Sequence, residues 1–190
     1  HDLFEGLFAR VGLVTDIELL EEFPARYEVA ASRQHRWARG DWQLLPWVFG
    51  RGFAGHDGHR CSIPLLGRWK MVDNLRRTLV APASVLALVV GWTLPLQSAA
   101  IWTGFVVAAL AIPTLPPVLA GLVPGRKGIS RRSHFRALFA DARLALSRTS
   151  LLLSLLAHQA WSMSDAIGRT LFRLFVSHRS LLEWVTAAQS

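Results

Sequence analysis

The chain has 190 residues, of which 52% are hydrophobic and eight are Trp, and its mean hydropathy is +0.30. This composition favours a membrane protein over an ordinary soluble domain. The formal net charge is +8, but the Lys and Arg residues flank apolar blocks and form no single patch, which argues against nucleic acid as a partner. One cysteine, Cys61, excludes an internal disulfide.

The first expected element is a short helix that starts at Asp2 and stops near Gly12. Its apolar residues are spaced for one face: Leu3, Phe4, Leu7, Phe8 and Val11. Asp2 and Glu5 are placed as an N-cap with its reciprocal acid. A carboxylate at a helix N-terminus is also kept charged by the helix dipole, as a general base requires, so a capping role and a catalytic role are compatible.

Residues 13–23 mix apolar and acidic positions, which predicts two short strands, or one strand and an extended arm, before Pro24. The acidic cluster Glu18, Glu21 and Glu22 is interpreted as a solvated face, or as partners for Arg26 and Arg33, rather than as metal ligands.

A longer helix is expected from Tyr27 to about Trp47 or Phe49, before the breaker Gly50-Arg51-Gly52. On this helix Arg33, Arg36, Trp37 and Gly40 share one face. A guanidinium group suits phosphate and an indole ring offers a flat platform for a sugar, so the face suits a nucleotide-sugar. A basic amphipathic helix lying on anionic lipid, with Trp at the interface, explains the same composition equally well.

Three potential zinc ligands, His56, His59 and Cys61, lie in the Gly-rich residues that follow. Their spacing matches no standard zinc module and a fourth ligand is not evident, so we expect a flexible loop and no metal site in this chain.

Residues 78–125 contain no charged side chain. A block of this length holds two membrane spans of about 20 residues each, with a turn near 91–98 and with Trp92 and Trp102 suited to an interface. Basic residues flank the block on both sides: Arg76 and Arg77 before it, and Arg126, Lys127, Arg131 and Arg132 after it. The positive-inside rule therefore predicts that both ends are cytoplasmic.

The last part of the chain is again helical in pattern over 135–163, where the neutral run 149–164 is short for a span. Crossing the membrane and lying partly embedded in it are equally supported for this run. An amphipathic helix over 166–176, with Arg169 and Arg173 one turn apart, and another near 181–187 are expected to dock on lipid or on a catalytic domain.

Two motifs together carry a resemblance. The first motif is His1-Asp2-Leu3-Phe4-Glu5-Gly6, and the second is Arg33-x-x-Arg36-Trp37, which begins 31 residues after Asp2. This pair resembles the last two motifs of membrane-bound, processive family-2-like glycosyltransferases. The sequence around Gly40-Asp41-Trp42-Gln43 and the tail at 166–175 and 181–186 are more similar to the cyclic β-1,2-glucan synthases, the family-84 glycosyltransferases. Osmoregulated glucan glucosyltransferases share the first two motifs, so the tail carries the narrower assignment.

The resemblance implies a mainly α membrane protein fragment. Residues 1–50 would be the C-terminal end of a GT-A-like α/β catalytic domain, and 51–76 a loop that approaches the membrane. Residues 77–122 would form a transmembrane hairpin, and 123–190 a basic loop, a third embedded or interfacial helix and the tail helices. Because the chain begins with His1 and not Met, we expect it to be a piece of a longer polypeptide and to be inactive alone.

In function, the resemblance implies glucose transfer from UDP-glucose, with inversion, to a growing β-1,2-glucan at the bacterial inner membrane. Asp2 would be the catalytic base, Arg33 and Arg36 would bind the donor diphosphate, and Trp37 would bind the acceptor. A divalent metal, Mg²⁺, would be held upstream of this fragment, and lipid and the rest of the polypeptide would be its other partners. Another membrane-bound glucan glucosyltransferase, or a non-catalytic anchoring module, are the alternatives.

Overall fold

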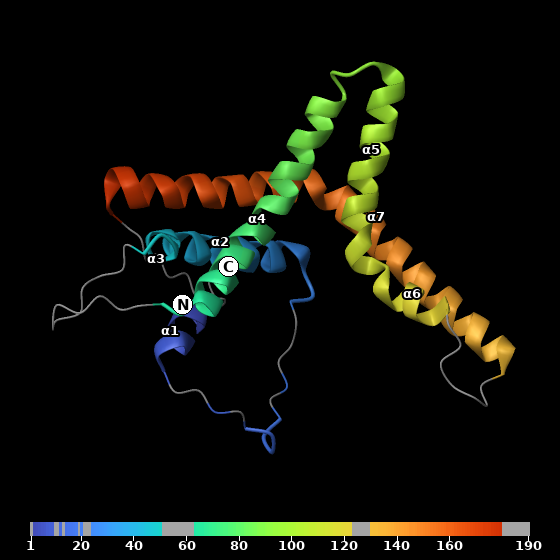
Figure 1. The fold of residues 1–190 in the computed structure, drawn as a ribbon, viewed down its shortest axis with the longest axis horizontal. Coiled ribbons are helices and arrows are strands. Elements are labelled where there is room, and N and C mark those ends of the chain that lie inside the picture. The colour runs from blue at the N-terminus through green and yellow to red at the C-terminus, as the bar shows by residue number, and fades with distance from the viewer. Residues whose placement is uncertain are drawn as a thin grey trace. The chain divides into compact units, whose positions relative to one another are not determined.

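The computed structural model describes residues 2–9, 12, 14–18, 20, 24–50, 63–122 and 130–179 (Figure 1). Most of these residues are helical, and none of them lies in a β-strand. The expectation of a mainly α fragment is therefore confirmed. The strands expected within 13–23 are wrong for the residues described there, where Pro24 and the interspersed acids leave an irregular arm.

The helices follow one another along the chain as α1 (Asp2–Phe8), α2 (Tyr27–Gln43), α3 (Leu45–Val48), α4 (Leu65–Gly91), α5 (Leu96–Ala111), the 3₁₀ turn η1 (Ile112–Thr114), α6 (Pro116–Leu122), α7 (Arg131–Phe172) and the π turn η2 (Arg173–Ser177). The helix predicted from Tyr27 is confirmed, but it breaks at Leu44. Pro46 explains the break, because a proline lacks an N–H and its ring clashes with the carbonyl four residues earlier.

The chain divides into two compact units, one made of His1–Val80 with Trp161–Ser190 and the other of Ala81–Ala160. Both α4 and α7 contribute residues to each unit. The continuity of α7 corrects the expectation of separate helices over 135–163 and 166–176. The boundary between them, at Ser164 and Asp165, contains neither Gly nor Pro and so does not interrupt the helix.

In the first unit, α1 packs on a small apolar core. Leu44, Ile63 and Met71 are buried, and Leu3, Phe4, Leu7, Trp47 and Val48 pack against them. The rings of Phe4 and Trp47 meet edge to face with centroids 4.6 Å apart. Gly67 permits the close approach of α1, because a Cβ there would lie 2.8 Å from both methyl carbons of Leu7.

In the second unit, α5 packs against the later turns of α4 and the middle of α7. The buried cluster is Ala81, Val106, Leu110, Leu156 and Ala160, and Val85, Ala87, Leu88, Leu152 and Leu153 pack on it. The chain turns between α4 and α5 at 92–95, within the turn predicted at 91–98. Trp102 Nε1 donates a hydrogen bond to the Ala87 carbonyl at 2.7 Å, and Trp92 Nε1 donates one to Thr103 Oγ1 at 3.2 Å.

Within the described residues, one helical segment, Leu96–Thr114, is long and apolar enough to cross a membrane. The expectation of two spans, and with it a multi-pass topology, is not supported. The uncharged part of α4 covers only 78–91, since Arg76 and Arg77 precede it and the turn follows. The neutral run 149–164 lies inside the long, charged helix α7 and does not qualify as a span.

A substitution at Gly91 should open the α4–α5 turn. A Cβ at Gly91 would clash with Trp102 Cδ1, so Gly91→Ala should push the ring from its place on the Ala87 carbonyl, at a cost of roughly 1 to 3 kcal/mol. Hydrogen exchange of the backbone amides over 87–103 should become faster. Gly104→Ala is the matched control, because nothing lies within 4 Å of its Cβ position. Equal exchange rates in the two variants would contradict this packing.

Candidate functional site

The basic and aromatic residues of α2 form the candidate site. The Arg33 guanidinium carbon lies 4.8 Å from the centroid of the Trp37 ring, one helical turn away, in a cation–π contact. The Trp37 side chain remains 56% exposed, while Arg33 and Arg36 are partly buried. The helix therefore brings Arg33 and Trp37 together as the spacing predicted, and Arg36 immediately precedes Trp37 on the same helix.

Asp2 is the first residue of α1, as predicted. Its side chain lies outside the described part of the structure, so its catalytic role stays a prediction. What the structure describes is the anchoring of its helix: Leu3, Phe4 and Leu7 hold α1 in the apolar core formed with Leu44 and Trp47, directly after α2. The predicted base and the predicted diphosphate-binding helix thus belong to one compact unit.

Two polar contacts hold the C-terminal half of α2 against α4. Asn74 Nδ2 donates to Asp41 Oδ1 at 2.9 Å, and Trp42 Nε1 donates to Thr78 Oγ1 at 2.9 Å. Burial raises the pKa of the Asp41 carboxyl, and the Asn74 hydrogen bond and the charge of Arg77 oppose that rise. Thr78 Oγ1 in turn donates a hydrogen bond to the Leu75 carbonyl at 2.8 Å, so it is free to accept the hydrogen bond from Trp42.

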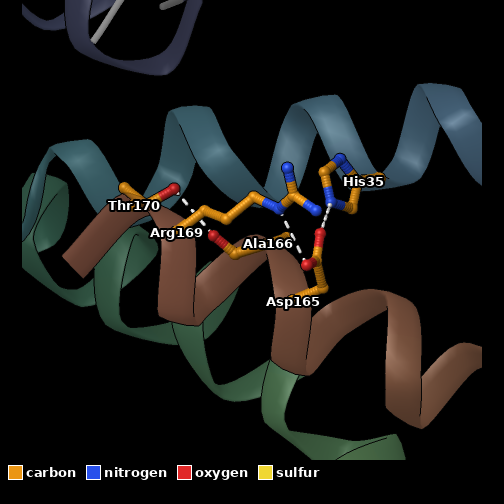
Figure 2. A network of polar contacts seen from close by, with 5 residues as sticks. All are labelled: His35, Asp165, Ala166, Arg169 and Thr170. Carbon is orange, nitrogen blue, oxygen red and sulfur yellow. Dashed lines mark hydrogen bonds and ion pairs between the residues drawn. The ribbon is translucent and has the colours of Figure 1, made fainter. Parts of the chain in front are cut away.

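A second network joins α2 to α7 (Figure 2). His35 Nε2 lies 3.0 Å from Asp165 Oδ2, and Arg169 Nε donates to Asp165 Oδ1 at 2.7 Å. The hydrogen bond from Arg169 is the main reason that the pKa of Asp165 lies below its ordinary value; His35 adds to this effect and burial opposes it. Thr170 Oγ1, one turn after Ala166, donates to the Ala166 carbonyl at 2.8 Å.

Sequence reasoning did not assign Asp41, Trp42 or Asp165 to these contacts. For the contact between α2 and α4, the usable signal was the four-residue spacing of Asn74 and Thr78, which puts two polar side chains on one face of an otherwise apolar helix. For the contact between His35 and Asp165, which are 130 residues apart, no local pattern could have found it.

The other sequence predictions either meet a different partner in the structure or fall outside the described residues. Arg26, expected near the acidic cluster, forms an exposed ion pair with Glu28 at 2.7 Å. His56, His59 and Cys61 lie outside the described residues, as do Glu21, Glu22 and the helix expected at 181–187. Among the described residues, no group of three or more His, Cys, Asp or Glu side chains could hold a metal ion.

The residue types on this part of α2 suit a phosphate-bearing ligand beside a flat apolar surface. Arg33 and Arg36 supply planar guanidinium donors, and the exposed Trp37 ring supplies a surface on which a sugar can stack. The contacts of His35, Asp41 and Trp42 fix the helix that carries these groups. Preorganised donors of this kind are what transfer of a charged group requires.

No protein-family model matches the chain. A search of curated proteins finds the cyclic beta-(1,2)-glucan synthase NdvB of Rhizobium meliloti (strain 1021), which is 46% identical over all 190 residues. The chain spans about 6% of the length of that relative. The resemblance to cyclic β-1,2-glucan synthases, narrowed to that family by the tail of the chain, is therefore confirmed over the whole chain. The chain is homologous along its entire length to a segment of a cyclic β-(1,2)-glucan synthase.

Proposed function

We propose that this chain is the donor-site and membrane-proximal segment of an inner-membrane glucosyltransferase that transfers glucose from UDP-glucose, with inversion, to a growing β-1,2-glucan. The observation that carries the proposal is the Arg33, Arg36 and Trp37 face on α2, in a chain 46% identical to a cyclic beta-(1,2)-glucan synthase. The homology supports the glucan product. The chemistry of the face supports a phosphate-bearing sugar donor.

In this proposal the residues have separate tasks. Asp2 accepts the proton of the acceptor hydroxyl as that oxygen attacks the anomeric carbon of the donor, and the UDP leaves from the opposite side. Arg36 binds the diphosphate and stabilises the charge that develops on it. Arg33 assists Arg36 at the diphosphate. Because the Arg33 guanidinium also lies over the Trp37 ring, it holds the indole in place for the acceptor sugar.

The proposal includes a divalent cation, Mg²⁺, whose ligands would be residues that precede His1. It would neutralise the leaving diphosphate together with Arg36. The other partners proposed are the growing glucan chain, membrane lipid and the rest of the polypeptide, without which this segment is expected to be inactive.

The alternative of a lipid anchor differs from this proposal in what it requires of the arginines. An anchor needs an interfacial indole and positive charge, and Lys supplies that charge as well as Arg does. A diphosphate site needs the planar fork of donors, which Lys lacks. Substitutions that keep charge and change geometry therefore separate the two functions.

Asp2→Asn in the full-length enzyme should abolish glucose transfer and leave the amount of membrane-inserted protein unchanged. Asn is also a good N-cap, so the start of α1 is kept and only the base is lost. Transfer of radiolabelled glucose in isolated membranes measures the effect. Glu5→Gln, which removes a charge from the same helix, is the control and should stay active. Near-normal turnover by Asp2→Asn would remove Asp2 from the mechanism.

Arg36→Lys should impair catalysis although it keeps the positive charge. The loss of one charge-assisted contact to the diphosphate is expected to cost about 1 to 3 kcal/mol, which is roughly a five- to 160-fold loss in kcat/KM for UDP-glucose. Arg26→Lys is the matched control, because Arg26 forms an exposed pair with Glu28 at the start of α2. If Arg36→Lys kept the kinetics of the unsubstituted enzyme, the anchor hypothesis would replace a diphosphate role.

The catalytic side is proposed to be cytoplasmic, because Arg76 and Arg77 lie between the catalytic motifs and the apolar segment Leu96–Thr114, and basic residues beside a span favour the cytoplasmic side.

A further inference from the structure

The side chain that precedes Arg36 on α2 contacts a distant part of the chain. His35 Nε2 lies 3.0 Å from Asp165 Oδ2, and both side chains are about three-quarters buried, with 26% and 27% of their surface exposed. Because an ionised carboxylate can only accept, the hydrogen is on Nε2 in this contact. The bond therefore persists whether the ring is neutral or doubly protonated.

The carboxylate of Asp165 is itself held in place. Arg169, one turn later on α7, binds Oδ1 and leaves Oδ2 directed toward His35 (Figure 2). Ala166 and Thr170 beside it are almost completely buried, with 0% and 1% of their surface exposed, so this turn of α7 is packed inside the unit. Asp165 thus presents a fixed acceptor to α2.

The contact between His35 and Asp165 lies next to Arg36 on α2. Successive residues on a helix are turned by about 100°, so the direction of His35 determines the direction of Arg36. The Asp41 and Trp42 contacts hold the later half of α2 to α4, whereas the His35 contact holds the turn that carries Arg36. Misplacing a catalytic group by about 1 Å costs up to a hundredfold in rate.

We propose that Asp165 is a positioning residue for the diphosphate site: through His35 it fixes the orientation of Arg36 toward the sugar-nucleotide donor. The inference rests on the proposed function of Arg36 and deepens it, because it makes the C-terminal part of α7 a component of the donor site. Asp165 touches no reacting group in this arrangement and acts only through His35.

The test is a double-mutant cycle in the full-length enzyme, with initial rates measured against UDP-glucose concentration in membranes. His35→Ala and Asp165→Ala should each raise the KM for UDP-glucose by roughly three- to tenfold, the scale of losing one ordinary hydrogen bond. The double variant should be no worse than either single variant, because both remove the same contact. His35→Gln, whose amide can still donate to Asp165, should recover most of the affinity for the donor.

Two further variants separate positioning from loss of fold. Glu28→Gln disrupts an exposed pair on the same helix and should leave the KM unchanged. Asp165→Asn keeps the volume and one acceptor and weakens both contacts, so it should raise the KM about two- to fivefold even if the alanine variants fail to accumulate.

The outcomes distinguish this inference from the function beneath it. A lower maximal rate with an unchanged KM would mean that Asp165 only supports folding, and effects that multiply in the double variant would mean that His35 and Asp165 act independently; either result overturns the positioning role. If Arg36→Lys changed the KM and Asp165→Asn did not, only this inference would fail. If Arg36→Lys had no effect, the proposed diphosphate site would fail as well.

Discussion

The structure depends on how α2, a helix with a single fully buried side chain, is held in place. In α2, Ala38 is the one fully buried side chain, so apolar packing contributes little to its position. The helix is held instead by hydrogen bonds between partly buried side chains, from His35 to α7 and from Asp41 and Trp42 to α4. Polar contacts of this kind are directional, and losing one partner leaves the other unsatisfied. They therefore fix the rotation of the helix, which is what a binding face on it requires.

The same helices change their packing chemistry along their length. In α4, Asn74 and Thr78 make the polar contacts to α2, and one turn later Ala81 and Val85 belong to an apolar cluster. In α7, Leu156 and Ala160 join that cluster, whereas Asp165 makes the contact to His35. The partners of both helices thus change from apolar to polar within one or two turns.

Local sequence patterns predicted much of the secondary structure. The spacing of apolar residues after Asp2, the helix from Tyr27 and the turn between α4 and α5 are all present, because each is set by residues close together in the chain. The continuity of α7 was missed because Arg169 and Arg173, one turn apart, suggested a new amphipathic helix, whereas Arg169 pairs with Asp165 one turn earlier on a continuous helix. The second span was overestimated, because counting uncharged residues ignores those that the turn consumes.

The candidate site was only partly accessible from sequence. The meeting of Arg33 and Trp37 follows from helical spacing alone. The contact of His35 could not be predicted in this way, because its partner Asp165 lies 130 residues away and neither local pattern points to the other. The roles of Asp2, Arg36 and Trp37 in glucose transfer rest on motif and homology, and so stay predictions.

The central claim is that α2 binds the donor diphosphate. Its most direct test is a structure of the full-length enzyme with UDP bound. The proposal expects diphosphate oxygens within about 3 Å of the Arg36 guanidinium, and the Asp2 carboxylate lining the same cavity. A UDP bound away from α2, with Arg36 facing lipid headgroups, would contradict the proposed function and make this helix an anchor.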